Sequence, residues 1–155
     1  MIAALLVLVL LTIVGIASLN LSNTEIQIAG HQVAYQQNFY RTEGAIVEAV
    51  ALLDGESDPK ADPPSWLEPN LDAITDEDIK NDIFWKNGSG TVTPDVSTLA
   101  DTRFVVLSQG IARGQGYGSS LDLNKVAVHE YKIYGRCAPE NKGTTILEIG
   151  YLKAF

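Results

Sequence analysis

The first 24 residues of the chain, Met1 to Thr24, contain no ionisable side chain, and the first charge belongs to Glu25. No lysine or arginine precedes Arg41, so the basic flank that normally orients a signal peptide or a membrane anchor is missing. About 20 apolar residues are enough to cross the hydrocarbon core of a bilayer as a helix. We therefore expect a membrane-competent helix, from which a basic leader before Met1 has been removed.

Cysteine and basic residues are also scarce. Cys137 is the only cysteine among the 155 residues, so no disulfide can form within the chain. The 19 acidic residues outnumber the 11 basic ones and give a net charge of −8, which argues against a nucleic-acid partner. Once the apolar segment is set aside, the remaining length is that of one domain with a modest core.

The chemistry of a catalytic or metal site is missing as well. His31, His129 and Cys137 are too few and too scattered in the sequence to predict a zinc site. No Gly-x-Ser-x-Gly motif is present, and two isolated histidines provide no acid–base constellation. We predict that the chain is not an enzyme and that it uses no cofactor.

One acidic run resembles a set of calcium ligands. Asp54, Glu56 and Asp58 alternate as the ligands of an EF-hand loop do, which makes them candidate metal ligands. The same loop would need a glycine where Pro59 stands and a glutamate where Ser65 stands. A solvated acidic loop is therefore the favoured interpretation.

The pattern of residues predicts an α+β fold in four parts. Residues 1–24 are expected to form an apolar helix and residues 25–53 the amphipathic half of the same helix, with the polar stretch Asn20 to Thr24 as a candidate kink or N-cap. Residues 54–102 are expected to be largely irregular, with one short helix from Thr75 to Phe84. Residues 103–155 are predicted to form an antiparallel sheet, with strands at Arg103–Ala112, Lys125–Cys137 and Thr144–Phe155.

The amphipathic half of the helix is expected to cover the sheet. Apolar residues between Tyr35 and Leu53 recur at spacings of three, four and seven, which places them on one helical stripe. The last strand carries apolar residues at every second position, so that they share one face. The predicted helix–sheet core consists of Tyr35, Phe39, Ile46, Val50, Leu53, Leu147, Ile149 and Tyr151.

Five segments together resemble type IV pilins, and more closely their PilX-like branch. In chain order they are LLVLVLLTIVGIAS (Leu5 to Ser18), NTEIQIAG (Asn23 to Gly30), FYRTEGAIVEA (Phe39 to Ala49), EYKIYGRC (Glu130 to Cys137) and ILEIGYLKAF (Ile146 to Phe155). The resemblance covers the first 53 residues well and the last 30 loosely.

This resemblance implies a pilin fold and a structural role without catalysis. A prepilin peptidase would cut after a glycine just before Met1 and methylate the new amino terminus. The subunit would wait in the inner membrane, and an assembly machinery would then draw it into a helical filament of identical chains on the bacterial surface. The residues expected to pack in the filament core are Leu5, Leu6, Val9, Leu10, Ile13, Val14 and Ile16.

The sequence departs from the pilin pattern at Leu5, where most pilins carry a glutamate. A buried, unpaired ammonium group is very costly, so the amine of Met1 must be neutral, lie near water, or face an acceptor such as Thr12. Two alternatives to the repeating subunit stay open: a minor pilin or pseudopilin that primes or tips a filament, and a single-pass anchored periplasmic binding domain. Candidate glycosylation sites are Asn87, in an Asn-Gly-Ser sequence, and the hydroxyls of Ser97 and Thr98.

Overall fold

The computed structural model of the chain describes residues 1–69, 74–87, 99–112, 127–140 and 142–154. They form two compact units, Met1–Gln36 and Gln37–Phe155. The first unit consists of helix, and the second contains the end of that helix, a four-stranded sheet and two short helices. The predicted α+β fold, with a long N-terminal helix packed on a mainly antiparallel sheet, is confirmed.

The long helix α1 spans Ile2–Gly55 and contains no proline. The hydroxyls of Thr12, Ser18 and Thr24 donate to the carbonyls of Val9, Val14 and Asn20 at 2.7, 2.9 and 3.0 Å. These bonds satisfy polar groups inside the helix, so the stretch from Asn20 to Thr24 stays helical and forms neither a break nor a new N-cap.

The sheet has the order β1-β2-β3-β4. The two-residue strand β1 (Leu67–Glu68) pairs in parallel with β2 (Thr102–Ile111), and it was not predicted from the sequence. Strands β2, β3 (Val128–Cys137) and β4 (Thr145–Ala154) are antiparallel neighbours. Their bounds agree with the predicted strands to within a few residues, and Lys125 lies outside the described residues.

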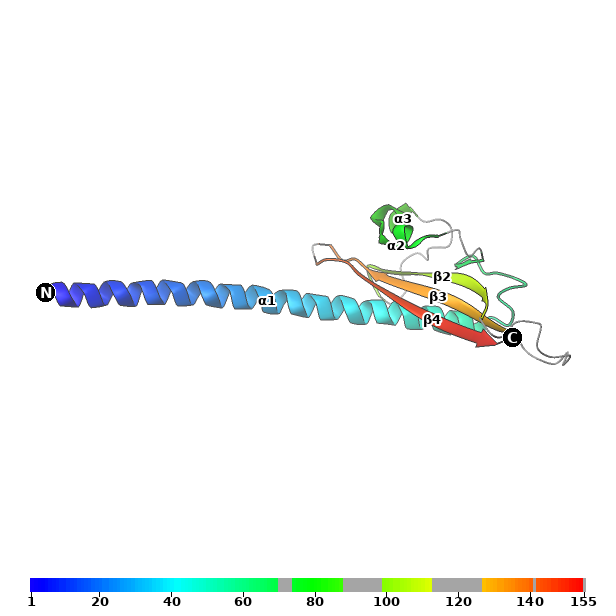
Figure 1. Cartoon of the computed structure of the whole chain (residues 1–155), viewed down its shortest axis with the longest axis horizontal. Coiled ribbons are helices and arrows are strands. Elements are labelled where there is room, and N and C mark those ends of the chain that lie inside the picture. The colour runs from blue at the N-terminus through cyan, green and yellow to red at the C-terminus, as the bar shows by residue number, and fades with distance from the viewer. Residues whose placement is uncertain (70–73, 88–98, 113–126, 141, 155) are drawn as a thin grey trace. The chain divides into compact units, whose positions relative to one another are not determined.

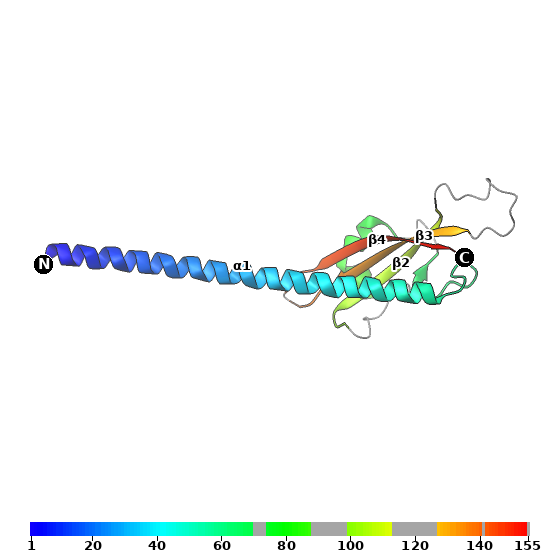
Figure 2. The same ribbon diagram turned by 90° about the horizontal axis from the view of Figure 1, so that it is seen from below.

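The part of α1 from Asn38 onward covers one face of the sheet (Figures 1 and 2). Its buried side chains follow a helical stripe: Asn38, Thr42, Ala45, Ile46, Ala49 and Leu53. The apolar members of this stripe pack with residues of β2 and β3 that alternate along each strand, namely Phe104, Val106, Tyr131 and Ile133. This cluster is the larger of the two cores of the second unit.

The predicted helix–sheet residues differ in their burial. Ile46 and Leu53 are buried in the cluster, whereas Val50, Leu147, Ile149 and Tyr151 are half-buried and pack against it. Phe39 is half-buried, and its ring meets that of Tyr40 edge-on at 5.8 Å. The prediction of Tyr35 as a core residue is wrong, because 62% of this residue is exposed. The buried stripe begins at Asn38, almost one turn later, and it starts with a polar residue that an apolar pattern could not include.

The opposite face of the sheet is covered by α2 (Asp76–Lys80) and α3 (Asp82–Asn87), as Figure 1 shows. The residues of this second core are Ile74, Ile79, Trp85, Val105, Leu107 and Tyr134. The capping box at Thr75 is present, with the Thr75 amide donating to Asp78 Oδ2 at 2.9 Å. The single helix predicted from Thr75 to Phe84 is nevertheless wrong, because Asn81 is extended and its Oδ1 accepts from the amide of Ile83, which starts a second helix.

Candidate functional site

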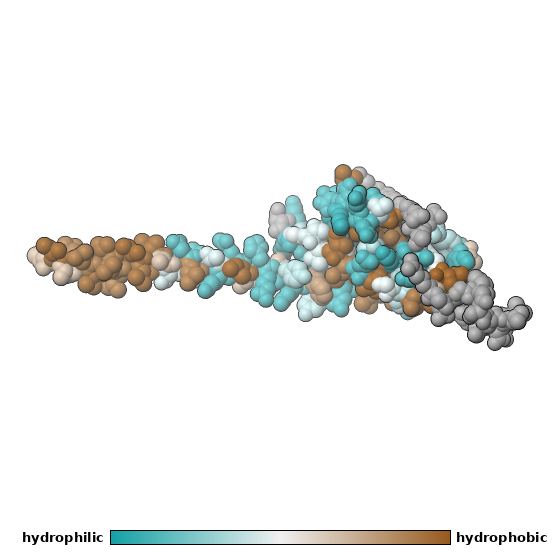
Figure 3. Space-filling view, in the orientation of Figure 1, coloured by the Kyte–Doolittle hydropathy of each residue, from teal (hydrophilic) through white to brown (hydrophobic). Residues whose placement is uncertain are grey.

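The first unit exposes a continuous apolar surface. The seven residues predicted for a filament core are all exposed in the single chain, from 49% at Val9 to 62% at Val14. Figure 3 shows the same segment as an unbroken stretch of hydrophobic side chains. Soluble proteins rarely leave an apolar patch of this extent uncovered, so it must meet lipid or other protein.

Within the part of the chain that the structure describes, α1 is the one helix long and apolar enough to cross a membrane. A helix pairs its backbone groups internally, which is the requirement for backbone inside a bilayer. Thr12, one candidate acceptor for the amine of Met1, gives its hydroxyl proton to the carbonyl of Val9. Its hydroxyl oxygen still has lone pairs to offer, and its role toward an amine stays a prediction.

A second exposed apolar feature continues beyond this segment. Ile26, Val33, Tyr40 and Val47 follow one another at intervals of seven residues in α1 and are 66, 53, 67 and 62% exposed. We call these four residues the heptad stripe. Ile26 and Val33 belong to the first unit and Tyr40 and Val47 to the second. Residues seven apart in an α-helix lie on nearly the same side of its axis, so within each unit the stripe keeps to one side of the helix.

In the second unit, the heptad stripe lies opposite the sheet. Tyr40 stands two residues from both Asn38 and Thr42, and Val47 stands two residues from both Ala45 and Ala49. Successive residues of an α-helix are rotated by about 100°, so a separation of two residues gives about 200°. Because those four neighbours are buried against the sheet, Tyr40 and Val47 project to the other side of α1.

The candidate calcium ligands are not brought together. Asp54 Oδ1 accepts a hydrogen bond of 2.5 Å from the hydroxyl of Tyr151 in β4. Asp58 Oδ1 accepts from the amides of Lys60 and Ala61 at 3.1 and 3.0 Å, which is a local turn. Among the described residues, no group of three histidines, cysteines, aspartates or glutamates could hold a metal ion. Glu56 therefore belongs to no such group either.

The histidines and the cysteine lie in different surroundings. His31 is exposed in the first unit, while His129 and Cys137 are buried in β3. Burial lowers the pKa of His129, with a smaller contribution from nearby Lys60. Burial also raises the pKa of the Cys137 thiol, whose Sγ lies 3.9 Å from Asn38 Oδ1. A buried thiol with a raised pKa is unreactive, so Cys137 acts as a packing residue.

The candidate glycosylation sites fall at or beyond the edge of the described residues. Asn87 is the last residue of α3, and Ser97 and Thr98 lie outside the described ranges. Glycosylation at all three positions therefore stays a prediction.

The fold and the exposed apolar helix define this chain as an α+β protein with a membrane-competent N-terminal helix. Comparison with protein-family models, with curated proteins and with solved structures found no match to the chain.

Proposed function

We propose that this chain is a type IV pilin-like structural subunit, which polymerises through α1 into a helical filament on the bacterial surface. The observation that carries the proposal is the exposed apolar surface of α1, which extends beyond the length a bilayer needs. A membrane would cover about 20 residues at the start of the chain. It would not cover Tyr40 and Val47, which belong to the same unit as the sheet.

The heptad stripe supports packing between copies rather than simple anchoring. A membrane anchor needs apolar residues only inside the bilayer, and beyond it an exposed helix face is normally polar. Here the helix face opposite the sheet stays apolar at Tyr40 and Val47. Identical chains that repeat one asymmetric contact form an open helical assembly when the rotation does not close.

In this proposal, the subunit is first processed and held in the membrane and is then assembled. A prepilin peptidase removes a leader and methylates Met1, and the apolar segment then holds the chain in the inner membrane. The assembly machinery next transfers the segment from lipid to the helices of other copies. Leu5 offers no carboxylate to the terminal amine, so we expect the amine to meet a carbonyl or hydroxyl oxygen, with Thr12 as the candidate acceptor.

A pair of variants tests this proposal. Val47→Glu places a charge in the heptad stripe, and Ile83→Glu places the same charge on α3 at a site that is also 62% exposed. Both side chains face solvent in the single chain, so both variants should fold. We expect electron microscopy of cells to show filaments with the Ile83 variant and a loss of at least tenfold in filament number with the Val47 variant, because a carboxylate buried between helices has no partner. Equal filament numbers would contradict packing through the stripe.

Two other functions remain distinguishable by experiment. A minor pilin or pseudopilin that primes or tips a filament would be nearly undetectable in purified filaments, whereas a repeating subunit would be the main protein. A single-pass anchored periplasmic binding domain would keep its leader and would be extracted from membranes as a detergent-soluble monomer.

A further inference from the structure

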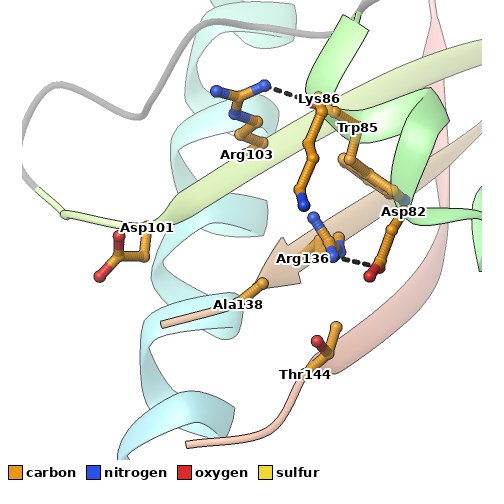
Figure 4. A pocket seen from close by; sticks show the side chains of 8 residues that line it. All are labelled: Asp82, Trp85, Lys86, Asp101, Arg103, Arg136, Ala138 and Thr144. Atoms are coloured by element: carbon orange, nitrogen blue, oxygen red, sulfur yellow. Dashed lines mark hydrogen bonds and ion pairs between the residues drawn. The ribbon is translucent and has the colours of Figure 1, made fainter. Parts of the chain in front are cut away.

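A polar pocket of about 330 Å³ lies at the end of the second core, where α3 meets β2 and β3 (Figure 4). None of the functions considered above uses it. The residues on which the following argument depends are Asp82, Trp85, Lys86, Arg103, Arg136 and Thr144.

Arg136 is the central group of this pocket, and only 7% of it is exposed. Its guanidinium carbon lies 5.8 Å from the centroid of the Trp85 ring, and its Nη2 donates to Asp82 Oδ1 at 2.5 Å. Its Nε–H is buried and has no acceptor in the described part of the chain. Buried donors are nearly always paired, so this one marks a place where an acceptor is missing.

Two further charged side chains stand near Arg136. Arg103 lies directly opposite Arg136 in the register of β2 and β3. Arg103 also donates through Nη1 to the carbonyl of Trp85, which holds its guanidinium beside the pocket. The side chain of Asp82 is 65% exposed, so solvent screens the compensation that it gives to Arg136.

Lys86 adds a third cation to the pocket, beside Arg136 and Arg103. Figure 4 shows its ammonium group directed from α3 toward the guanidinium of Arg136, while Thr144 presents a hydroxyl at the opposite wall. An anion between Lys86 and Arg136 would lie between two positive charges, and a turn of the guanidinium toward the pocket would bring its buried Nε–H within reach of the anion. Thr144 would offer it a third hydrogen bond.

We propose that this pocket binds a carboxylate group. A guanidinium edge matches the two oxygens of a carboxylate in geometry, as it does those of a phosphate. Asp82 and Asp101 line the same pocket, and their negative charges repel a dianion more strongly than a monoanion. A carboxylate carries one charge at neutral pH and a phosphate group between one and two, so the carboxylate is the favoured ligand.

The test uses the full chain, labelled with nitrogen-15 and kept monomeric in detergent micelles. The Arg136 Nε–H resonance, assigned through its bonds to the backbone, is followed while sodium acetate is added, with sodium chloride of equal ionic strength as the reference. We expect a saturable shift with acetate only, at a millimolar midpoint. We also expect Lys86→Gln to raise that midpoint by about five- to tenfold, through the loss of one charge-assisted bond. The matched control, Lys60→Gln, removes a lysine that lines a different pocket and should leave the midpoint unchanged.

Three results would overturn the proposal: equal shifts with acetate and chloride, a shift that does not saturate, or tighter binding of inorganic phosphate than of acetate. A shift without acetate, when the protein is raised above one chain per micelle, would assign the carboxylate to a second copy of the chain, and no such shift would assign it to a free acid. The acetate titration itself is run with at most one chain per micelle, so failure here is separate from failure of filament assembly.

Discussion

Gly135 in β3 lies where α1 passes directly over the sheet. A Cβ added there would stand 2.7 Å from Ile46 Cγ1 and 2.9 Å from the backbone oxygen of Thr42. Real Cβ atoms do not approach other atoms so closely, and a backbone oxygen in a helix cannot move aside on its own. The absence of a side chain at Gly135 is therefore what allows the helix to approach β3.

Replacing Gly135 by alanine should lower the free energy of unfolding by about 1–3 kcal/mol, the usual cost of overpacking a core. Urea unfolding followed by circular dichroism measures it. Gly150→Ala is the matched control, since Gly150 lies in the neighbouring strand and a Cβ there would meet no atom within 4 Å. Equal stabilities of the two variants would show that α1 does not pack on β3 as described.

Lys153 in β4 donates hydrogen bonds to the end of α1, about 100 residues earlier in the chain. Its Nζ donates to the carbonyls of Leu53 and Glu56 and lies 3.4 Å from that of Asp54. The last carbonyls of a helix lack partners within it, and a positive charge there also favours the helix dipole. Lys153 therefore joins the last strand to the end of the first helix.

Replacing Lys153 by methionine keeps most of the aliphatic stem and removes the donor. We expect a loss of about 1–2 kcal/mol in the free energy of unfolding, because the backbone carbonyls at the end of α1 lose their charged donor. Lys132→Met is the comparison, because Lys132 pairs with Glu148 at 3.5 Å on the surface, where such pairs contribute about 0–1 kcal/mol. The account of the helix end would be wrong if the Lys153 variant were no less stable than the Lys132 variant.

At the scale of elements, periodicity predicted what depends on burial and missed what depends on polar contacts. The strands could be predicted because successive side chains of a strand point to opposite faces of the sheet, so apolar residues at every second position share one face. The start of the buried stripe could not be predicted, because it depends on contacts distant in the sequence. Asn38 is polar, and its Nδ2 donates to the carbonyls of Lys142 and Gly143, 104 and 105 residues away. The short β1 could not be predicted either, since two residues carry no period.

The pocket around Arg136 was equally invisible in the sequence. Its residues come from α3, β2, β3 and the chain next to these strands and β4, and the pairing of Arg103 with Arg136 brings two arginines together. The heptad stripe, in contrast, is present in the sequence. It becomes distinct from the core stripe only when the side of α1 that faces the sheet is known.

The apolar segment of α1 allows a prediction at this same scale. Leu10→Lys introduces a charge in the middle of that segment, where Leu10 is 61% exposed in the single chain. A lysine between packed helices has no partner, so we expect filaments to be absent from the cell surface, as judged by electron microscopy. Leu10→Met, which keeps an apolar side chain of similar volume, should leave filaments present. Normal filaments with the lysine variant would contradict a central bundle of α1 helices.

At the scale of the whole molecule, the chain combines a compact α+β unit with an apolar helix that a single copy cannot cover. Thr42, Ala45, Ala49 and Gly135 are small residues, and their contact commits one side of α1 to the sheet. The other side is exposed at Tyr40 and Val47 in the single chain. This division of one helix between folding and assembly is the physical basis of the proposed function.

The most direct test is to shear filaments from the cell surface, purify them, and read the N-terminal residue of their main protein by mass spectrometry. The account predicts filaments built mainly from this chain and beginning with methylated Met1. It would be contradicted if the chain were recovered only from membranes, as a detergent-soluble monomer that still carries a leader.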